Sequence, residues 1–243
     1  MLAADEQADV SASEVLSALD DLAAPLHIRA GASSFEAVAR LNQHLFKTLG
    51  FAGDSEDYYA PHNSFVNRVI ARRKGLPIAL SVIYIEVGRR AGVPLRGVGF
   101  PGHFLVSTLA TEDDPRFFVD PFHMGRVHTE DELLARLSQM PVPPEQYAAC
   151  MAPATTQQIV LRMSFNLKGS YLSLRALPDA IRQIDRVLAL DPDRAEEHRD
   201  RGLLLAEEGR GDEASDSLRR YLQARPHADD RAIILEVLGQ LEE

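Results

Sequence analysis

Apolar side chains recur at helix-like spacings through the first part of the chain. Val15, Leu19, Leu22 and Leu26 mark one such stretch, and two further stretches follow after short polar segments. Serine or asparagine residues, which commonly cap helices, precede the second and the third stretch. The pattern therefore predicts helices over about 13–26, 34–49 and 65–74.

A fourth predicted helix, over about 77–91, is apolar around most of its circumference. Pro77 suits its first turn, because the N–H that proline lacks has no helical partner there. A helix without a polar face is buried on all sides. We expect this helix to lie at the centre of its domain.

Strand-like segments appear only after this helix, over 95–99, 103–109 and 116–120. The letters TEDDP at 111–115 predict a hairpin connection between the last two strands. A short helix is predicted over about 129–138. Helices first and an antiparallel sheet afterwards indicate an α+β fold, not a doubly wound one.

An internal repeat begins at about residue 156, where the strand pattern ends. Small, apolar and proline positions recur 34 residues later: Ala180 and Ala214, Ile184 and Leu218, Pro192 and Pro226. A helix–turn–helix unit of this length is the signature of tetratricopeptide (TPR) repeats. Residues 156–243 are therefore predicted to form about two TPR-like repeats and a terminal helix, although Arg201 replaces a large apolar residue of the pattern. Such an array predicts a protein or peptide partner.

Composition narrows the function classes. The chain has 243 residues, a formal net charge of −10 and one cysteine, Cys150. An acidic chain is a poor candidate for nucleic-acid binding, and one cysteine allows neither an internal disulfide nor a multi-cysteine metal site. The N-terminus lacks the features of a signal peptide, and the longest apolar stretch, 76–88, is too short to span a bilayer. We therefore expect a cytoplasmic protein with a flexible segment over 1–12, a first domain over 13–150 and the repeats over 156–243.

His103 and Asp120 are the first candidates for chemistry. A hairpin centred on TEDD pairs 107 with 116, 105 with 118 and 103 with 120. Directly opposed residues share a sheet face, with Cβ atoms about 4.5–5.5 Å apart. The carboxylate can then accept from one imidazole nitrogen, which fixes the tautomer and leaves the other nitrogen as a base. A satisfied structural pair is the alternative.

Three longer stretches carry a family resemblance: NSFVNRVIARRKGLPIALSVIYIE at 63–86, GVGFPGHFLV at 97–106 and VDPF at 119–122. They resemble the SirB1 family, in which a transglutaminase-like, papain-type domain precedes TPR-like repeats. In transglutaminase-like domains a nucleophilic cysteine begins the central helix, and the histidine and aspartate lie on following strands. The resemblance implies a papain-like core with His103 and Asp120 at the catalytic positions. It also implies a binding cleft, to which we assign Asn63, Arg73, Phe104 and Phe122.

The position of the cysteine is occupied by Pro77, which offers no nucleophile. Cys150 follows the histidine and aspartate in the chain, and a lone cysteine in this setting is more often a small buried hydrophobe. Ser81 lies one turn after Pro77 on the same helix face. The favoured function is therefore a non-catalytic binding or regulatory protein. The alternative is a hydrolase or acyltransferase of altered chemistry that uses His103 and Asp120 with Ser81 or a water molecule.

Two other groupings have ordinary explanations. A metal site is open in principle to four histidines and one carboxylate: His62, His103, Asp120, His123 and His128. Since no paired helical histidine spacing occurs, loop histidines without a ligand role are favoured, and neither a metal nor a cofactor is expected. A basic cluster at 72–74, 89–90 and 96 can receive an acidic partner or a phosphate, but a solvated rim is favoured.

Overall fold

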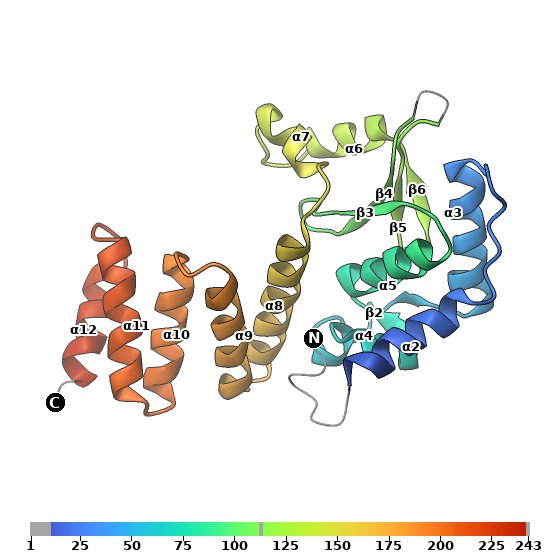
Figure 1. Cartoon of the computed structure of the whole chain (residues 1–243). Helices are drawn as coiled ribbons and strands as arrows, with labels where there is room; N and C mark the ends of the chain where they lie inside the picture. Colours follow the sequence, from blue (N-terminus) through green and yellow to red (C-terminus); the bar gives the residue numbers. More distant parts are fainter. Residues whose placement is uncertain (1–10, 112–113, 242–243) are drawn as a thin grey trace. The chain divides into compact units, whose positions relative to one another are not determined.

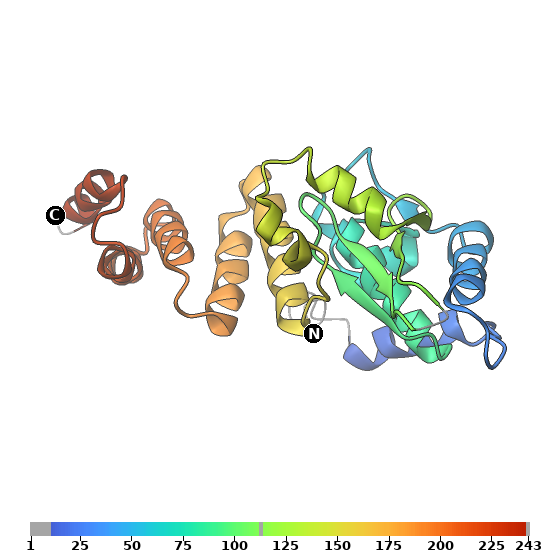
Figure 2. The same ribbon diagram turned by 90° about the horizontal axis from the view of Figure 1, so that it is seen from above.

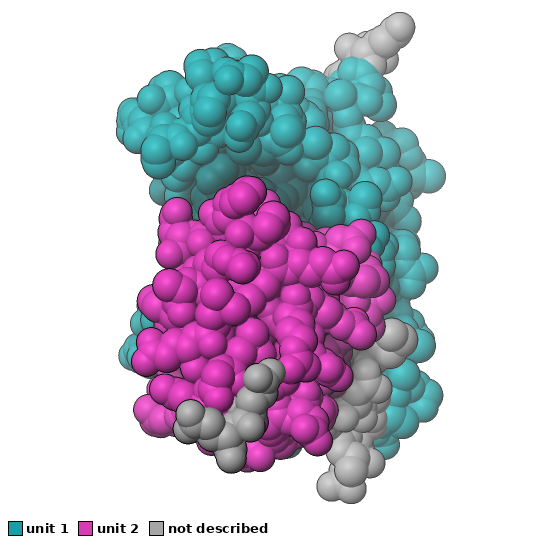
Figure 3. All heavy atoms as spheres, turned by 90° about the vertical axis from the view of Figure 1, so that its left-hand side faces the viewer, with its two compact units in different colours: residues 1–159 teal, residues 160–243 magenta. Residues whose placement is uncertain are grey.

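The computed structural model describes residues 11–111 and 114–241 (Figure 1). The chain divides into two compact units, 1–159 and 160–243, which Figure 3 shows in different colours. Most of the segment predicted to be flexible, 1–12, lies outside the described residues. Within the described residues, no helix has the length and apolar character that crossing a membrane requires.

The N-terminal helices of the first unit begin where their sequences provide caps. Helix α2 (Ala12–Ala23) starts at Ser11, whose hydroxyl accepts from the Glu14 N–H while the Glu14 side chain accepts from the Ser11 N–H. Helix α3 (Ser34–Asn42) starts with the same capping box. The elements that follow are a π-helical continuation of α3 at Gln43–Thr48, a 3-10 turn at Pro61–Asn63 and helix α4 (Val66–Arg72).

Helix α5 (Pro77–Arg90) is the buried central helix that the sequence predicts. Pro77 is its first residue, and most of its side chains are buried. Ile83, Tyr84 and Val87 are at most 1% exposed and pack with side chains of α2, α3 and the sheet in one apolar core. At about 25 cal/mol per Å² of buried apolar surface, such a helix contributes strongly to the stability of the unit.

The sheet has the strand order β3-β4-β5-β6 and is antiparallel throughout. Its strands are Leu95–Val98, Leu105–Thr108, Phe118–Asp120 and Arg126–His128. The first three match predicted strands but are shorter. Strand β6 is not predicted, because its letters RVH offer a single apolar residue and no alternation. A parallel pairing of β1 (Ala52–Gly53) with β2 (Lys74–Gly75) is likewise too short to leave a pattern.

Both faces of the central strands β4 and β5 are buried, which explains why these two strands do not alternate between apolar and polar residues. Val106 and Val119 face the core that contains α5. Leu105 and Phe118 pack with Leu133 of helix α6 (Glu130–Leu137). Figures 1 and 2 show α5 and α6 on opposite sides of the sheet. The α+β class and the central helix are thus confirmed; a 3-10 turn at Pro144–Gln146 and helix α7 (Tyr147–Cys150) follow.

The second unit is an array of antiparallel helices with the predicted repeat. Its helices are α8 (Thr156–Ser173, whose first turn belongs to the first unit), α9 (Leu177–Leu190), α10 (Ala195–Glu207), α11 (Gly211–Ala224) and α12 (Arg231–Leu241). Ala180 in α9 and its equivalent Ala214 in α11 are both fully buried. A Cβ atom at Gly202 would lie 2.6 Å from the Leu218 side chain, so α10 and α11 approach closely only because this residue is glycine.

Polar networks join the helices of this array. The Lys168 ammonium of α8 lies 2.8 Å from both carboxylate oxygens of Glu197 and 2.7 Å from Asp200, both on α10. Arg201, which replaces the usual apolar residue, lies 2.7 Å from Asp185 on α9 and 2.8 Å from the Ser217 hydroxyl on α11. An ion pair to α9 and a hydrogen bond to α11 therefore take the place of an apolar contact.

Candidate functional site

His103 lies in the tight turn between β3 and β4, not in a strand. Gly102 has a φ of 69°, and the His103 N–H donates to the Phe100 carbonyl at 3.0 Å. Phe100 and Phe104 are buried on either side of the histidine. The letters FPGHF thus form an anchored turn in which a glycine supplies the left-handed conformation. The turn holds the His103 ring in place with 9% of the residue exposed.

Asp120 ends strand β5 and receives hydrogen bonds on both carboxylate oxygens. Its Oδ1 accepts from the backbone N–H groups of Phe122 at 3.1 Å and His123 at 3.2 Å. Its Oδ2 lies 2.8 Å from Nε2 of His103. Asp120 is only 2% exposed, so these contacts take the place of hydration for a buried carboxylate.

The strand register behind this pair differs from the predicted one. Ser107 pairs with Phe118 instead of with residue 116, so the ladder is shifted by two residues. The hairpin does centre on TEDD, because the Thr111 N–H donates to the Asp114 carbonyl at 2.9 Å and the Thr108 N–H to the Phe117 carbonyl at 3.0 Å; the predicted pairing placed that centre one residue too early. The predicted direct opposition of His103 and Asp120 is therefore wrong. A shift of two keeps side chains on the same face, and the turn at Gly102 brings the imidazole back to the carboxylate.

His123 completes the group and was not part of the predicted pair. Its Nδ1 lies 2.8 Å from the same Asp120 oxygen that contacts His103, and its side chain is 62% exposed. The residue sits in a turn that closes with the Gly125 N–H on the Asp120 carbonyl at 2.8 Å. The sequence signal was the spacing Asp120-x-x-His123 before a glycine, which places the histidine over the carboxylate that begins the turn.

Contacts from two helices hold this turn in place. The Asn42 amide of α3 donates to the Gly125 carbonyl at 2.8 Å, and the Tyr84 hydroxyl of α5 donates to Asn42 Oδ1 at 2.9 Å. A Cβ at Gly125 would lie 2.3 Å from Asn42, and its φ is 77°, so both space and backbone conformation require glycine there. Sequence reasoning missed Asn42, because a contact across 83 positions leaves no local pattern.

The electrostatics of Asp120 fix the hydrogen positions of the group. Burial alone raises the pKa of Asp120, but hydrogen bonds and charge interactions with His103 and His123 outweigh it and lower the pKa from 3.8 to about 2. The carboxylate is therefore ionised at neutral pH and can only accept hydrogen bonds. Nε2 of His103 and Nδ1 of His123 must both donate, so in neutral His103 the basic nitrogen is Nδ1.

Aromatic rings surround the two histidines. The Phe122 ring lies 6.1 Å from the His103 ring and 5.2 Å from the His123 ring, both edge to face. Tyr58 contacts Phe122 at 6.0 Å. A Cβ at Gly53 would lie 2.5 Å from Phe122, so the β1 backbone packs directly on this ring. The predicted binding residue Phe122 thus belongs to the His103 site.

The other predicted binding residues make their contacts in neighbouring parts of the unit. Asn63 is fully buried; its amide donates to the Asp57 carbonyl and accepts from Arg72, both at 2.7 Å. Arg73 ends α4 with a φ of 59°, and its guanidinium lies 4.7 Å from the Phe51 ring. Phe104 packs against Gly97. These side chains shape the loops that carry the site, with Asn63 joined to the segment before α5.

The cysteine position, Pro77, and the two nucleophile candidates, Ser81 and Cys150, lie in different surroundings. Pro77 begins α5, as the resemblance expects for the cysteine position. Ser81 is fully buried, and within the described part of the chain its hydroxyl has no hydrogen-bond partner. Cys150 is in α7 and packs with the apolar cluster beneath α6.

Acidic partners within the chain neutralise most of the basic cluster. Arg72 pairs with Asp54 at 3.0 Å and Lys74 with Glu56 at 3.3 Å. Arg89 and Arg90 pair with Glu86. This pairing favours the solvated rim over a phosphate or nucleic-acid surface.

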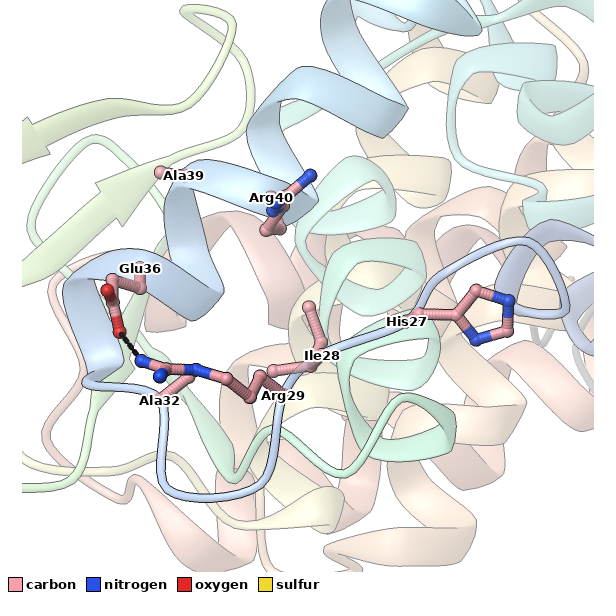
Figure 4. Close-up of a pocket in the computed structure, with 7 residues that line it drawn as sticks. All are labelled: His27, Ile28, Arg29, Ala32, Glu36, Ala39 and Arg40. Atoms are coloured by element: carbon pink, nitrogen blue, oxygen red, sulfur yellow. Dashed lines mark hydrogen bonds and ion pairs between the residues drawn. The ribbon is translucent and has the colours of Figure 1, made fainter.

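A surface pocket of about 390 Å³ lies between the segment 27–32 and helix α3 (Figure 4). Its lining comprises His27, Ile28, Arg29, Ala32, Glu36, Ala39 and Arg40. An ion pair of 3.5 Å between Arg29 and Glu36 crosses it, and both side chains are largely exposed. None of these residues belongs to the His103 group, so the pocket adds nothing to that site.

Comparison with known proteins agrees with this architecture. Residues 13–165 match the family model of the transglutaminase-like superfamily, and residues 167–239 match that of the tetratricopeptide repeat. A UPF0162 protein of Xylella fastidiosa (strain 9a5c) is 42% identical over 193 residues, which cover 78% of this chain and 68% of the relative. A UPF0162 protein of Vibrio cholerae is 32% identical over 184 residues, which cover 74% of this chain and 65% of the relative.

The chain is also similar to a larger eukaryotic protein. F-box only protein 21 of Homo sapiens is 31% identical over 170 residues, covering 64% of this chain and 26% of that protein. No solved structure matches the chain. Three observations indicate the same family: the match over 13–165, the buried central helix and the His103–Asp120 pair. The chain therefore belongs to the transglutaminase-like superfamily, as a SirB1-like relative of the UPF0162 proteins with TPR repeats after its transglutaminase-like domain.

Proposed function

We propose that this protein is a non-catalytic binding protein, which has kept the transglutaminase-like framework without its thiol chemistry. One observation carries the proposal: Pro77 stands at the first position of α5, where active members of the family place their cysteine. A helix N-terminus is a good place for a thiolate, because the helix dipole and free N–H groups stabilise negative charge. Proline uses that position for its fixed backbone angle and provides no reactive atom.

The remaining candidates do not replace the thiol well. A nucleophile must reach both its base and a substrate, whereas the Ser81 hydroxyl is fully buried within α5. Cys150 packs with apolar side chains around Leu133 and Met151, which fits a small hydrophobic residue. Both observations favour binding over acyl transfer.

The TPR-like unit supplies the binding surface in this proposal. TPR repeats generally mediate protein–protein contacts, and the partner class is therefore a protein or peptide. Helix α12 offers exposed apolar side chains for such a contact, Ile233 at 62% and Leu235 at 46%. The polar network around Lys168 and Arg201 holds the helices behind this surface in register. A cytoplasmic location remains a prediction from the sequence.

An altered enzyme is the second candidate, and the ionised Asp120 favours it. The carboxylate orients the His103 ring and leaves Nδ1 as the basic nitrogen, which is the arrangement that general-base catalysis uses. A hydrolase or acyltransferase of this kind would use His103 to activate a water molecule or Ser81. The aromatic ring of Phe122 would form one wall of the substrate site.

Activity measurements on the full chain separate the two candidates. Ester and amide probes are incubated with wild type, with His103→Ala and with Pro77→Cys. The binding proposal expects no His103-dependent turnover from wild type. Turnover that His103→Ala abolishes while circular dichroism stays unchanged would overturn it and establish the enzyme. Pro77→Cys is the informative addition, because a thiol placed there should gain reactivity toward an alkylating reagent if the position still faces His103.

Capture experiments test the binding surface itself. Wild type and the double variant Ile233→Asp/Leu235→Asp are compared for proteins retained from a lysate, and each retained protein is then purified and titrated directly. A partner bound by wild type and lost in the variant, with helicity unchanged, supports the role of α12. Equal affinity for wild type and variant would remove α12 from the proposed surface.

A further inference from the structure

Three metal-binding side chains converge at the end of β5. His103, Asp120 and His123 each offer one ligand atom, and these three atoms lie within 4.8 Å of one another. Asp120 Oδ2 lies 2.8 Å from Nε2 of His103 and 2.8 Å from Nδ1 of His123. The three side chains come from the turn at 99–104, the end of strand β5 and the turn at 121–125, so the grouping is a product of the fold and not of one helix.

We propose that His103, Asp120 and His123 bind one divalent first-row transition metal ion. The sequence analysis left such a site open in principle and favoured histidines without a ligand role; the geometry supports the alternative. The inference stands apart from the proposed binding function, because it rests on the donor atoms of the first unit alone.

The donor spacing suits such an ion. Ligand distances of about 2.1 Å place neighbouring donors about 3.0 Å apart in octahedral geometry and about 3.4 Å apart in the tetrahedral geometry of zinc. The observed nitrogen–oxygen separations of 2.8 Å are close to the octahedral spacing, so the ion needs only small shifts of the side chains. A neutral imidazole carries one proton and can move it to the other nitrogen, so both rings can ligate without gaining a charge.

The donor set decides the class of metal. Two imidazoles and one carboxylate match zinc and iron sites that keep open positions for water or substrate. Calcium and magnesium prefer sets made of oxygen donors and fit poorly. The ionised Asp120 supplies one negative charge, which offsets part of the charge of a divalent ion.

Backbone contacts orient the carboxylate as metal sites require. The Phe122 and His123 N–H groups hold Oδ1, which leaves Oδ2 directed at the two imidazoles. Hydrogen bonds of this kind, which orient a metal-binding carboxylate, typically contribute tenfold or more to metal affinity. The His123 side chain is 62% exposed, so an ion has an entry path from solvent.

Zinc and cobalt titrations of the full chain test the site. Protein freed of metal with a chelator is titrated with Zn²⁺ by calorimetry and with Co²⁺ by visible absorption. Wild type is expected to bind one ion per chain, to develop a cobalt spectrum with nitrogen ligands, and to unfold at a higher temperature with Zn²⁺ present. His123→Ala should weaken binding by at least about tenfold and abolish the thermal shift.

Because His123 is exposed, the His123→Ala variant should keep the fold, which circular dichroism verifies. His27→Ala is the matched control, since His27 is also an exposed histidine of the first unit but lies outside the group; it should bind like wild type. His103→Gln gives a second test from the other turn. Binding weaker than about 1 mM in wild type, or equal affinity in wild type and His123→Ala, would overturn the proposal.

Discussion

Replacing Lys168 by methionine removes a buried cation that two carboxylates share. The Lys168 ammonium lies 2.8 Å from both oxygens of Glu197 and 2.7 Å from Asp200. The side chains of Lys168 and Glu197 are 10% and 9% exposed, and that of Asp200 is 28% exposed. Methionine keeps the length and the apolar stem, so the substitution tests the charge and not the packing.

The expected loss is about 3 kcal/mol in the free energy of unfolding of the second unit. Removing one partner of a buried ion pair costs roughly 3–5 kcal/mol, because the other charge remains buried and unpaired. The lower end applies here, since Asp200 retains some contact with water. A domain of ordinary stability has about 5–15 kcal/mol in total, so the variant should be clearly destabilised.

Lys74→Met provides the matched control in an exposed pair. Lys74 lies 3.3 Å from Glu56, and the two side chains are 47% and 89% exposed. Exposed pairs contribute about 0–1 kcal/mol. The same substitution should therefore change stability by less than about 1 kcal/mol at this position.

Hydrogen exchange read by mass spectrometry is the suitable assay, because it reports each unit separately. Peptides from α8 and α10, and from α4 and α5 for the Lys74–Glu56 pair, are followed across a urea series in wild type, Lys168→Met, Lys74→Met and the double variant Lys168→Met/Glu197→Gln. The double variant should recover part of the loss, since it removes the orphaned charge. Equal stability of Lys168→Met and wild type, or no recovery in the double variant, would refute the reasoning.

Two further substitutions test the site and the array. Because the folded pKa of Asp120 is lowered from 3.8 to about 2, the ionised group contributes about 2 kcal/mol above pH 4, which is lost as the pH falls toward 2. Asp120→Asn should lower stability by about that amount at pH 7 and flatten its pH dependence between 4 and 2; unchanged urea midpoints across this range would contradict the assignment. Gly202→Ala should lower the thermal unfolding midpoint, since its Cβ would lie 2.6 Å from Leu218 and overpacking costs about 1–3 kcal/mol. Gly239→Ala, where nothing among the described residues lies within 4 Å of the added Cβ, should instead be neutral or stabilising, and equal effects of the two would count against the packing argument.

The helices and the repeat were predictable because their signals are local or periodic. Serine caps with a glutamate three residues later mark the start of α2 and α3. The buried helix α5 shows itself by apolar residues on every face and by Pro77 at its start. The 34-residue period of Ala180 and Ala214 reflects equivalent buried positions in successive helix pairs.

The details of the site depended on contacts that the local pattern does not contain. The predicted hairpin register was wrong by two residues, because it centred the pairing one residue too early: Thr111 pairs with Asp114 across TEDD, as Thr108 pairs with Phe117. Asn42 holds the turn after Asp120 from 83 positions away. His123 was expected to have no ligand role because no paired helical histidine spacing occurs; the turn at Gly125, where φ is 77°, instead brings it to Asp120.

Structural and ligand roles separate cleanly within the His103–Asp120–His123 group. Asp120 receives two backbone N–H groups and two imidazoles, so it stabilises the turn whatever the site binds. His103 is largely buried beside it and shares that role. His123 differs, because its largely exposed ring gains little from a hydrogen bond that water can replace. Stability alone therefore gives little reason for a histidine at this position. A third metal-donor atom, on a ring open to solvent, gives a chemical reason. His123 is accordingly the residue whose removal distinguishes a ligand site from a structural pair.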